Sequence, residues 1–189
     1  MATAIYPGSF NPPTVAHLAI SQAVLDQREI DTIIWSVSRV ALGKETLETP
    51  KFEHRIAILE EVADEYGWLQ IQVTEAQLLA EIAVGYDLLI MGADKWHQIQ
   101  DPIFYDGDSG SRDLAIAKLP ALAIVPREPF TAPSAQELEL PEDMNLVSSS
   151  KARGGSTSLM LPPALIFDKQ TGAWTDIQKY ELWLTQKTD

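Results

Sequence analysis

Residues 8–17, GSFNPPTVAH, combine residue types that suit phosphate binding. An apolar segment precedes them and a helical pattern follows them, so their glycine-containing turn should join a strand to the start of a helix. Free backbone N–H groups and the helix dipole both point toward an anion at such a place. Thr14 and His17, three residues apart, should share one face of that first helical turn. The alternative is structural: Thr14 would cap the helix and His17 would pack in the core.

A second candidate lies at residues 147–153, VSSSKAR. Ser148, Ser149 and Ser150 can cap a helix, and their hydroxyls can also bind phosphate oxygens. Arg153, one turn into that helix, offers a planar fork that binds two phosphate oxygens at once. The alternative is a polar turn that follows a strand.

A third candidate, residues 91–99, MGADKWHQI, follows the apolar run DLLIM. Ligands of α/β proteins bind at the carboxyl ends of the strands, where Gly92 and Asp94 should lie. Asp94 could accept hydrogen bonds from a ribose. Trp96 could stack on a base, although packing in the core is the simpler expectation.

These three segments need a scaffold of alternating strands and helices. Strands are expected at residues 3–6, 32–37, 69–73, 88–91 and 122–125, and helices at 15–26, 51–66 and 75–84. This alternation indicates a parallel sheet wound by right-handed crossovers. The strands read as continuous apolar runs, which is typical of strands covered on both faces. The sequence therefore predicts an α/β, Rossmann-like parallel sheet flanked by helices on both faces.

The remaining segments are expected to lie around that sheet. Residues 101–113 and 128–143 are rich in turn-forming or polar residues and predict surface loops. The tail predicts a C-terminal strand-turn-helix extension docked on the sheet. We therefore expect a Rossmann-like domain at residues 1–160 and an extension of the same domain at residues 161–189.

Composition limits the class of ligand and the compartment. The 189 residues include 27 acidic and 14 basic ones, and the net charge of −13 repels nucleic acids and anionic membranes. The sequence has no cysteine, shows no signal peptide and has no apolar run long enough to span a bilayer, so a cytoplasmic protein is expected. The three histidines, His17, His54 and His97, lack metal-ligand spacing, so no protein-held metal is expected.

Taken together, GSFNPPTVAH and VSSSKAR resemble the two signature motifs of the nucleotidylyltransferase superfamily. The first resembles Gly-x-Phe-[Asn/Asp]-Pro-x-[His/Thr]-x-Gly-His, and the second resembles Ile-Ser-Ser-Thr-x-x-Arg. They lie near opposite ends of one domain, as in that superfamily. The resemblance covers about residues 1–160 and implies a Rossmann-like fold and transfer of a nucleoside monophosphate from a triphosphate to a phosphate-bearing acceptor.

Within the superfamily, the chain is most similar to nicotinate or nicotinamide mononucleotide adenylyltransferases, through Arg55 in FEHRIAILEEVA and through MGADKW. Such an enzyme belongs to NAD biosynthesis. Thr14, in place of the first motif histidine, is more like phosphopantetheine adenylyltransferase. Ala16 stands where the superfamily has Gly. The alternatives are therefore an enzyme of the phosphopantetheine or cytidylyltransferase type, and a nucleotide-binding protein that has lost turnover.

The resemblance also implies roles for individual residues. His17 would donate to the α-phosphate with help from Thr14, and Arg153 with the three serines would hold the β- and γ-phosphates. Mg²⁺ would arrive with ATP and keep mostly water ligands. A homo-oligomer is an open expectation, because superfamily members often form one. The remaining nucleotide contacts are expected from Gly8, Ser9, Phe10, Asn11, Gly92 and Asp94, and the acceptor contacts from Lys44, Arg55 and Trp96.

Overall fold

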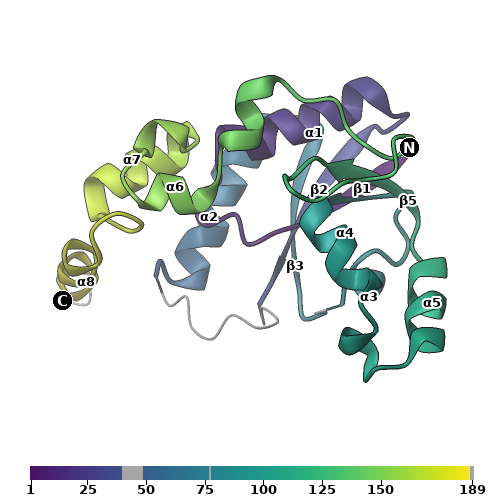
Figure 1. The fold of residues 1–189 in the computed structure, drawn as a ribbon. Coiled ribbons are helices and arrows are strands. Elements are labelled where there is room, and N and C mark those ends of the chain that lie inside the picture. Colours follow the sequence, from purple (N-terminus) through teal and green to yellow (C-terminus); the bar gives the residue numbers. More distant parts are fainter. Residues whose placement is uncertain (40–48, 77, 188–189) are drawn as a thin grey trace.

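The centre of the molecule is a five-stranded parallel sheet with the order β3-β2-β1-β4-β5, shown in Figure 1. The structure is a computed structural model that describes residues 1–39, 49–76 and 78–187. Each end of every strand lies within one residue of its predicted position. The strands are β1 (Thr3–Pro7), β2 (Thr32–Ser38), β3 (Leu69–Thr74), β4 (Leu88–Gly92) and β5 (Ala121–Val125).

The strand order reverses beside β1, which pairs with β2 on one side and with β4 on the other. The register places Tyr6 opposite Trp35 and Ile5 opposite Leu89. The chain leaves β1 at Gly8, whose N–H donates to the carbonyl of Ser36 at 3.0 Å. In open α/β sheets, ligands bind at the carboxyl ends of strands where the order reverses.

Helices cover both faces of the sheet, as predicted. α1 (Val15–Gln27) and α2 (Phe52–Asp64) share one buried cluster with Ala4 and Tyr6 of β1. α3 (Leu79–Ile82) and α4 (Ala93–Gln100) share another with Ile5. Successive β1 residues thus enter opposite clusters, because side chains alternate between the faces of a strand.

Two predictions about the middle of the chain were wrong in extent. The helix expected over residues 75–84 is only the short α3. The loop expected over residues 101–113 contains η1 (Pro102–Tyr105) and the start of α5 (Ser109–Ala117). The Asp108 carboxylate accepts from the N–H groups of Gly110 and Ser111 at 3.0 and 3.1 Å, so these turn-forming residues begin a helix. Residues 128–143 do lack helices and strands up to η2 (Glu142–Leu146).

The strand predicted in the C-terminal extension was also wrong. α6 (Ser149–Arg153) and η3 (Thr157–Leu159) lead into two helices, α7 (Pro162–Thr171) and α8 (Ile177–Gln186). Prolines at the start of α7 suit a first helical turn, and Gly172 ends it with φ of 74°. The apolar residues that resembled a strand are thus the packing residues of a helix.

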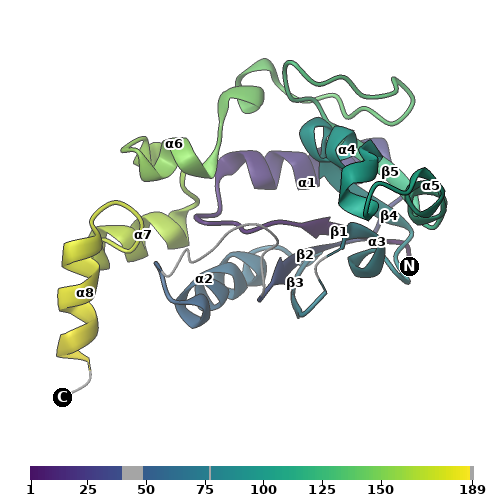
Figure 2. The same ribbon diagram turned by 60° about the horizontal axis from the view of Figure 1, so that its bottom comes forward.

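The helices α7 and α8 pack against α2, whereas Leu161, just before α7, joins the buried cluster that α1 and α2 share with the sheet. Ile58 of α2 shares a buried cluster with Ala164, Trp174 and Tyr180. The hydroxyl of Tyr180 also accepts from the N–H of Lys51 at 2.9 Å. In Figures 1 and 2, α7 and α8 lie on the side of the molecule opposite α5. Within the described ranges, every helix is too short or too polar to cross a lipid bilayer.

Candidate active site

The loop between β1 and α1 is shaped by the ring of Phe10. Phe10 is 1% exposed and stacks on Trp35 with centroids 4.7 Å apart. A Cβ at Gly8 would meet this ring at 2.9 Å, which explains the glycine. Phe10 itself has φ of 42°, in the left-handed region. This conformation costs a non-glycine residue ~1–2 kcal/mol, so the loop is held in place by its packing.

Thr14 and His17 are in contact at the start of α1. The backbone N–H and the hydroxyl of Thr14 both lie 2.9 Å from Nδ1 of His17. Thr14 is 0% exposed, so its hydroxyl faces His17 and not solvent. Since Nδ1 accepts a hydrogen bond, we assign the proton of the neutral ring to Nε2. The imidazole is thereby fixed with one N–H donor directed away from Thr14.

The charge state of His17 is set by its surroundings. Burial, and secondarily the positive charge of Arg127, lowers the pKa of His17 from 6.5 to about 3. Its ring packs against Phe10 at 4.9 Å and Tyr6 at 6.2 Å between centroids. At neutral pH, His17 is therefore an uncharged donor and not a cation.

Arg127 brings a positive charge to this place, and the sequence analysis missed it. Burial raises the pKa of Tyr6, while Arg127 lowers it and Asp94 raises it, so both charges lie near Tyr6. The Arg127 side chain also passes Gly92, where a Cβ would lie 3.6 Å from its Cγ. The sequence could have indicated Arg127 by its position directly after the apolar run of β5, since ligands bind at the carboxyl ends of such strands.

The serine-rich helix α6 contacts the β1–α1 loop. Ser148 caps α6 by accepting from the N–H of Lys151 at 3.2 Å. Ser149 donates its hydroxyl to the carbonyl of Pro12 at 2.8 Å. Arg153 donates to the carbonyl of Asn11 and, at 3.1 Å, to the hydroxyl of Ser150. A guanidinium has five N–H groups, so donors of Arg153 remain for another acceptor.

The β4–α4 junction places two of the three predicted residues at the strand ends. Gly92 caps α4, and Asp94 is exposed in its first turn. The Asp94 Oδ1 would lie 2.3 Å from a Cβ at Gly92, so the carboxylate folds over the glycine. Trp96 instead packs in the buried cluster of α3 and α4. Lys44 lies outside the described residues.

A cleft of about 570 Å³ opens at the carboxyl ends of β1, β2 and β4. Its lining includes Gly8, Ser9 and Gly92, but His17 and α6 are not among the described residues that form it. The cleft and the His17 region thus meet at the β1–α1 loop. The cleft's hydroxyl, cationic and aromatic side chains come from Tyr6, Ser9, Ser36, Ser38, Arg39, Arg55, Lys95, Phe104 and Tyr105.

Two polar groups in this cleft lack hydrogen-bond partners among the residues that the structure describes. Ser36 is 1% exposed, and neither its hydroxyl nor Nε of Arg55 has a hydrogen-bond partner within the described part of the chain. Burial also lowers the pKa of the Arg55 guanidinium. The guanidinium carbons of Arg39 and Arg55 lie 4.6 and 5.2 Å from the centre of the Phe52 ring. Nε of Arg55 and the Ser36 hydroxyl are therefore available to a ligand. The Arg39 guanidinium, in contrast, lies 3.3 Å from the Glu75 carboxylate and 3.9 Å from that of Glu53.

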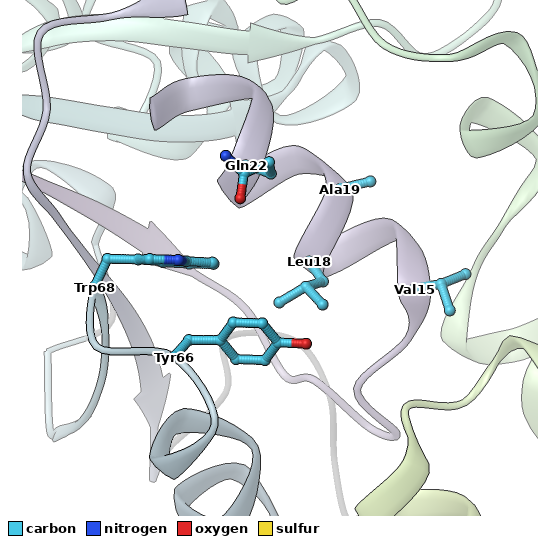
Figure 3. A pocket seen from close by; sticks show the side chains of 6 residues that line it. All are labelled: Val15, Leu18, Ala19, Gln22, Tyr66 and Trp68. Carbon is cyan, nitrogen blue, oxygen red and sulfur yellow. The ribbon is translucent and has the colours of Figure 1, made fainter. Parts of the chain in front are cut away.

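Another hollow, of about 310 Å³, lies between α1 and the segment that joins α2 to β3, shown in Figure 3. Tyr66 and Trp68 line one side of it, and α1 lines the other. No charged side chain is among its described lining residues, which are Val15, Leu18, Ala19, Gln22, Tyr66 and Trp68. This hollow does not suit a polyanion.

Ala16, the departure from the superfamily motif, is 4% exposed. Its methyl group and its backbone are therefore both covered by protein. The side chain is not directed into open space where it would meet a bound nucleotide.

Comparisons with known proteins agree with the fold and with the motifs. A curated relative, the "Probable nicotinate-nucleotide adenylyltransferase" of Salinibacter ruber (strain DSM 13855 / M31), is 34% identical over 64 residues. These cover 34% of this chain and 33% of that protein, so the match spans about a third of the relative's length.

Two solved structures of Plasmodium falciparum nicotinic acid mononucleotide adenylyltransferase share the fold. The structure complexed with APC has a TM-score of 0.63, and the alignment covers 92% of this chain and 96% of that one. The structure complexed with NaAD has a TM-score of 0.56, and the alignment covers 92% of this chain and 98% of that one. Both are 16% identical in sequence, and at this identity the likeness concerns the fold alone.

The family model described as cytidylyltransferase-like matches residues 5–155, which include the β1–α1 loop, the sheet apart from the first two residues of β1, and the serine-rich helix. Because this match covers well over half of the sequence, the chain belongs to the cytidylyltransferase-like family.

Proposed function

We propose that this protein transfers AMP from ATP to nicotinate mononucleotide and releases pyrophosphate. The observation that carries the proposal is the neutral, oriented His17 beside the cation Arg127, at the point where the two motif segments meet. A preorganised N–H donor next to a cation suits the negative charge that grows on a transferring phosphoryl group.

The chemical step needs positioning more than acid–base catalysis. The acceptor's phosphate is already ionised near neutral pH, and one of its oxygens attacks the α-phosphorus of ATP. A new P–O bond forms while the bond to the bridging oxygen breaks, and pyrophosphate leaves with the electron pair. Holding two polyanions in line, with their charge offset, is the main requirement.

We assign the triphosphate to the region of His17 and α6. His17 donates through Nε2–H to the α-phosphate, and Thr14 keeps its ring oriented. Arg127 and Arg153 offset the charge of the phosphates, together with the hydroxyls of the serine-rich helix. Gly8, Ser9, Phe10 and Asn11 shape the loop beneath them. Gly92 and Asp94 are assigned to the nucleoside.

We assign the acceptor to the cleft. A mononucleotide has a phosphate and an aromatic ring, and the cleft offers Arg39 and Arg55 for the first and Phe104 and Tyr105 for the second. A ligand phosphate would compete with Glu53 and Glu75 for Arg39, whereas Nε of Arg55 has no hydrogen-bond partner among the described residues. The adenylyltransferases named above act on this class of acceptor, which also favours the assignment.

Magnesium would accompany ATP. The described residues contain no group of three or more His, Cys, Asp or Glu side chains that could hold a metal ion. The donors of the site are N–H groups, hydroxyls and guanidinium groups, with Asp94 as an exposed carboxylate. This set fits an ion that keeps phosphate and water ligands, and the ion would offset charge on the phosphates. We further propose a cytoplasmic location.

The test is a pyrophosphate-release assay with purified protein and Mg²⁺. ATP and CTP are each paired with nicotinate mononucleotide, nicotinamide mononucleotide and phosphopantetheine. The proposal expects pyrophosphate with ATP and nicotinate mononucleotide, and it expects the dinucleotide product by mass spectrometry.

Other results would replace the proposal. A preference for CTP would favour a cytidylyltransferase. Turnover with phosphopantetheine and with neither mononucleotide would show that phosphopantetheine is the acceptor. Nucleotide binding without pyrophosphate release for any pair would favour a binding protein without turnover.

A further inference from the structure

We propose that Trp174, in the C-terminal extension, is a positioning residue for the nucleotide site. Its indole N–H donates to Oδ1 of Asn11 at 2.5 Å, across 163 residues of sequence. Asn11 lies in the β1–α1 loop between Phe10 and the prolines that precede Thr14. The inference rests on the proposed function only for its kinetic readout, because nucleotide binding and loop protection can be measured separately.

The contact fixes the orientation of the Asn11 amide. Asn11 is 0% exposed and Trp174 is 7% exposed, so water does not compete for the bond. An indole nitrogen only donates, whereas an amide can present either its oxygen or its nitrogen. Trp174 therefore requires the amide oxygen to face it, which directs Nδ2 elsewhere. Nδ2 has no hydrogen-bond partner among the described residues, so within them the bond from Trp174 is the hydrogen bond that orients this amide.

Trp174 is itself held in a rigid turn. The Asp168 carboxylate, 4% exposed, accepts from the backbone N–H of Trp174 at 2.7 Å and from that of Thr175 at 3.1 Å. It also accepts from the Thr175 hydroxyl at 2.7 Å. Gly172, where a Cβ would lie 2.7 Å from the carbonyl of Asp176, makes this turn possible. The indole thus comes to Asn11 already oriented.

Asn11 links this turn to the groups that would hold the triphosphate. Its carbonyl accepts from Arg153, and its neighbour Phe10, in a left-handed conformation, packs against His17. A displaced Asn11 would therefore disturb Arg153 and His17 together. Two further bonds tie the same loop to the chain before α7: Leu161 donates to the carbonyl of Pro13 at 3.1 Å, and Thr14 pairs with Met160. Of these three contacts between residues 160–174 and the loop, the contact from Trp174 is the one that a side chain makes.

The test compares Trp174→Phe with Trp183→Phe. The first removes the indole N–H and keeps an aromatic ring. The second makes the same exchange in α8, where Trp183 packs with His54, Phe167 and Tyr180. It controls for loss of packing in the extension. Each variant is measured by calorimetric titration with ATP, by steady-state kinetics and by thermal unfolding. Hydrogen exchange of residues 5–14 is measured in parallel.

For Trp174→Phe we expect kcat/KM for ATP to fall about tenfold, the loss typical of one buried hydrogen bond. KM for the acceptor should stay within twofold, and residues 5–14 should lose exchange protection. Trp183→Phe should leave the loop and ATP binding unchanged, even if it lowers Tm equally. ATP parameters of Trp174→Phe within twofold of the parent would overturn the proposal. A loss of ATP binding in both variants, in proportion to the fall in their Tm values, would also overturn it.

A mutant cycle separates action through Asn11 from a general effect. Asn11→Ala removes the acceptor, so adding Trp174→Phe to it should change ATP binding and loop protection no further. Additive losses would contradict the proposal. If the parent binds ATP but does not turn over, the proposed function fails while binding and exchange still decide the role of Trp174. If the parent binds no nucleotide, both ideas are wrong.

Discussion

Thr14 and His17 form a pair in which the backbone N–H and the hydroxyl of Thr14 both lie 2.9 Å from Nδ1 of His17. The pair ends the strained β1–α1 loop and begins α1. It leaves one ring proton, on Nε2, available to a ligand. The sequence already placed the two residues on one helical face, and the structure adds that Thr14 acts on His17 and does not itself face solvent.

His17→Ala should reduce kcat by about a hundred- to a thousandfold, because a donor aimed at developing charge is typically worth ~2.7–4 kcal/mol in the transition state. ATP affinity should change much less, since the other phosphate contacts remain. Steady-state kinetics and calorimetric titration on one preparation check both statements. Turnover equal to that of the parent would show that His17 is a core residue only.

The stability of the protein should fall in mild acid because of His17. Its folded pKa is about 3, below the value of 6.5 for a free histidine. Between these values the unfolded chain binds a proton that the folded protein does not. The free energy of unfolding therefore falls as pH decreases from 6.5 toward 3, by up to ~1.4 kcal/mol per pH unit.

The measurement is urea unfolding of the parent and of His17→Gln at pH 7.5 and 5.5. Between these two pH values the parent should lose ~1.4 kcal/mol more than the variant. Contributions from other groups, including His54 with its lowered pKa, are common to both proteins. Equal losses would mean that His17 titrates normally in the folded state.

Arg127→Gln should weaken ATP binding by about ten- to a hundredfold, the range expected when a charge-assisted contact is lost. The effect should shrink as salt rises, because added ions screen the interaction. Arg28→Gln is the matched control: Arg28 donates to the carbonyls of Gln27 and Glu137. If titration shows equal affinities for the two variants, the charge of Arg127 does not act on the nucleotide.

Ala16→Gly should lower stability by ~1 kcal/mol, the difference between Gly and Ala in a helix, with a fall in Tm of ~2–4 °C. ATP affinity should stay within twofold, since the methyl group is covered. Ala23→Gly, at another buried position of α1, should show the same loss of stability and the same unchanged ATP affinity. Tighter ATP binding in Ala16→Gly alone would show that the methyl group obstructs the nucleotide.

The sequence by itself determined the sheet and the two motifs. Continuous apolar runs such as residues 32–37, alternating with helical patterns, are typical of strands buried on both faces of a parallel sheet, and they placed all five strands. Gly8, Thr14 and His17 could be singled out because a turn and a helix start are local features. The strand expected in the extension was wrong because a short apolar run suits a strand and a buried helix equally.

Only the tertiary structure decided which distant groups meet at the site. Arg127 follows an ordinary strand, and its position at the strand ends does not by itself indicate that its charge acts on His17 and Tyr6. Ser36 and Arg39 became candidates only once β2 was placed beside β1. The contact of Trp174 with Asn11 depends on how α7 and α8 dock on α2. Such long-range contacts arise from the packing of whole elements, which local residue preferences do not encode, and they determine how the loop at the site is held.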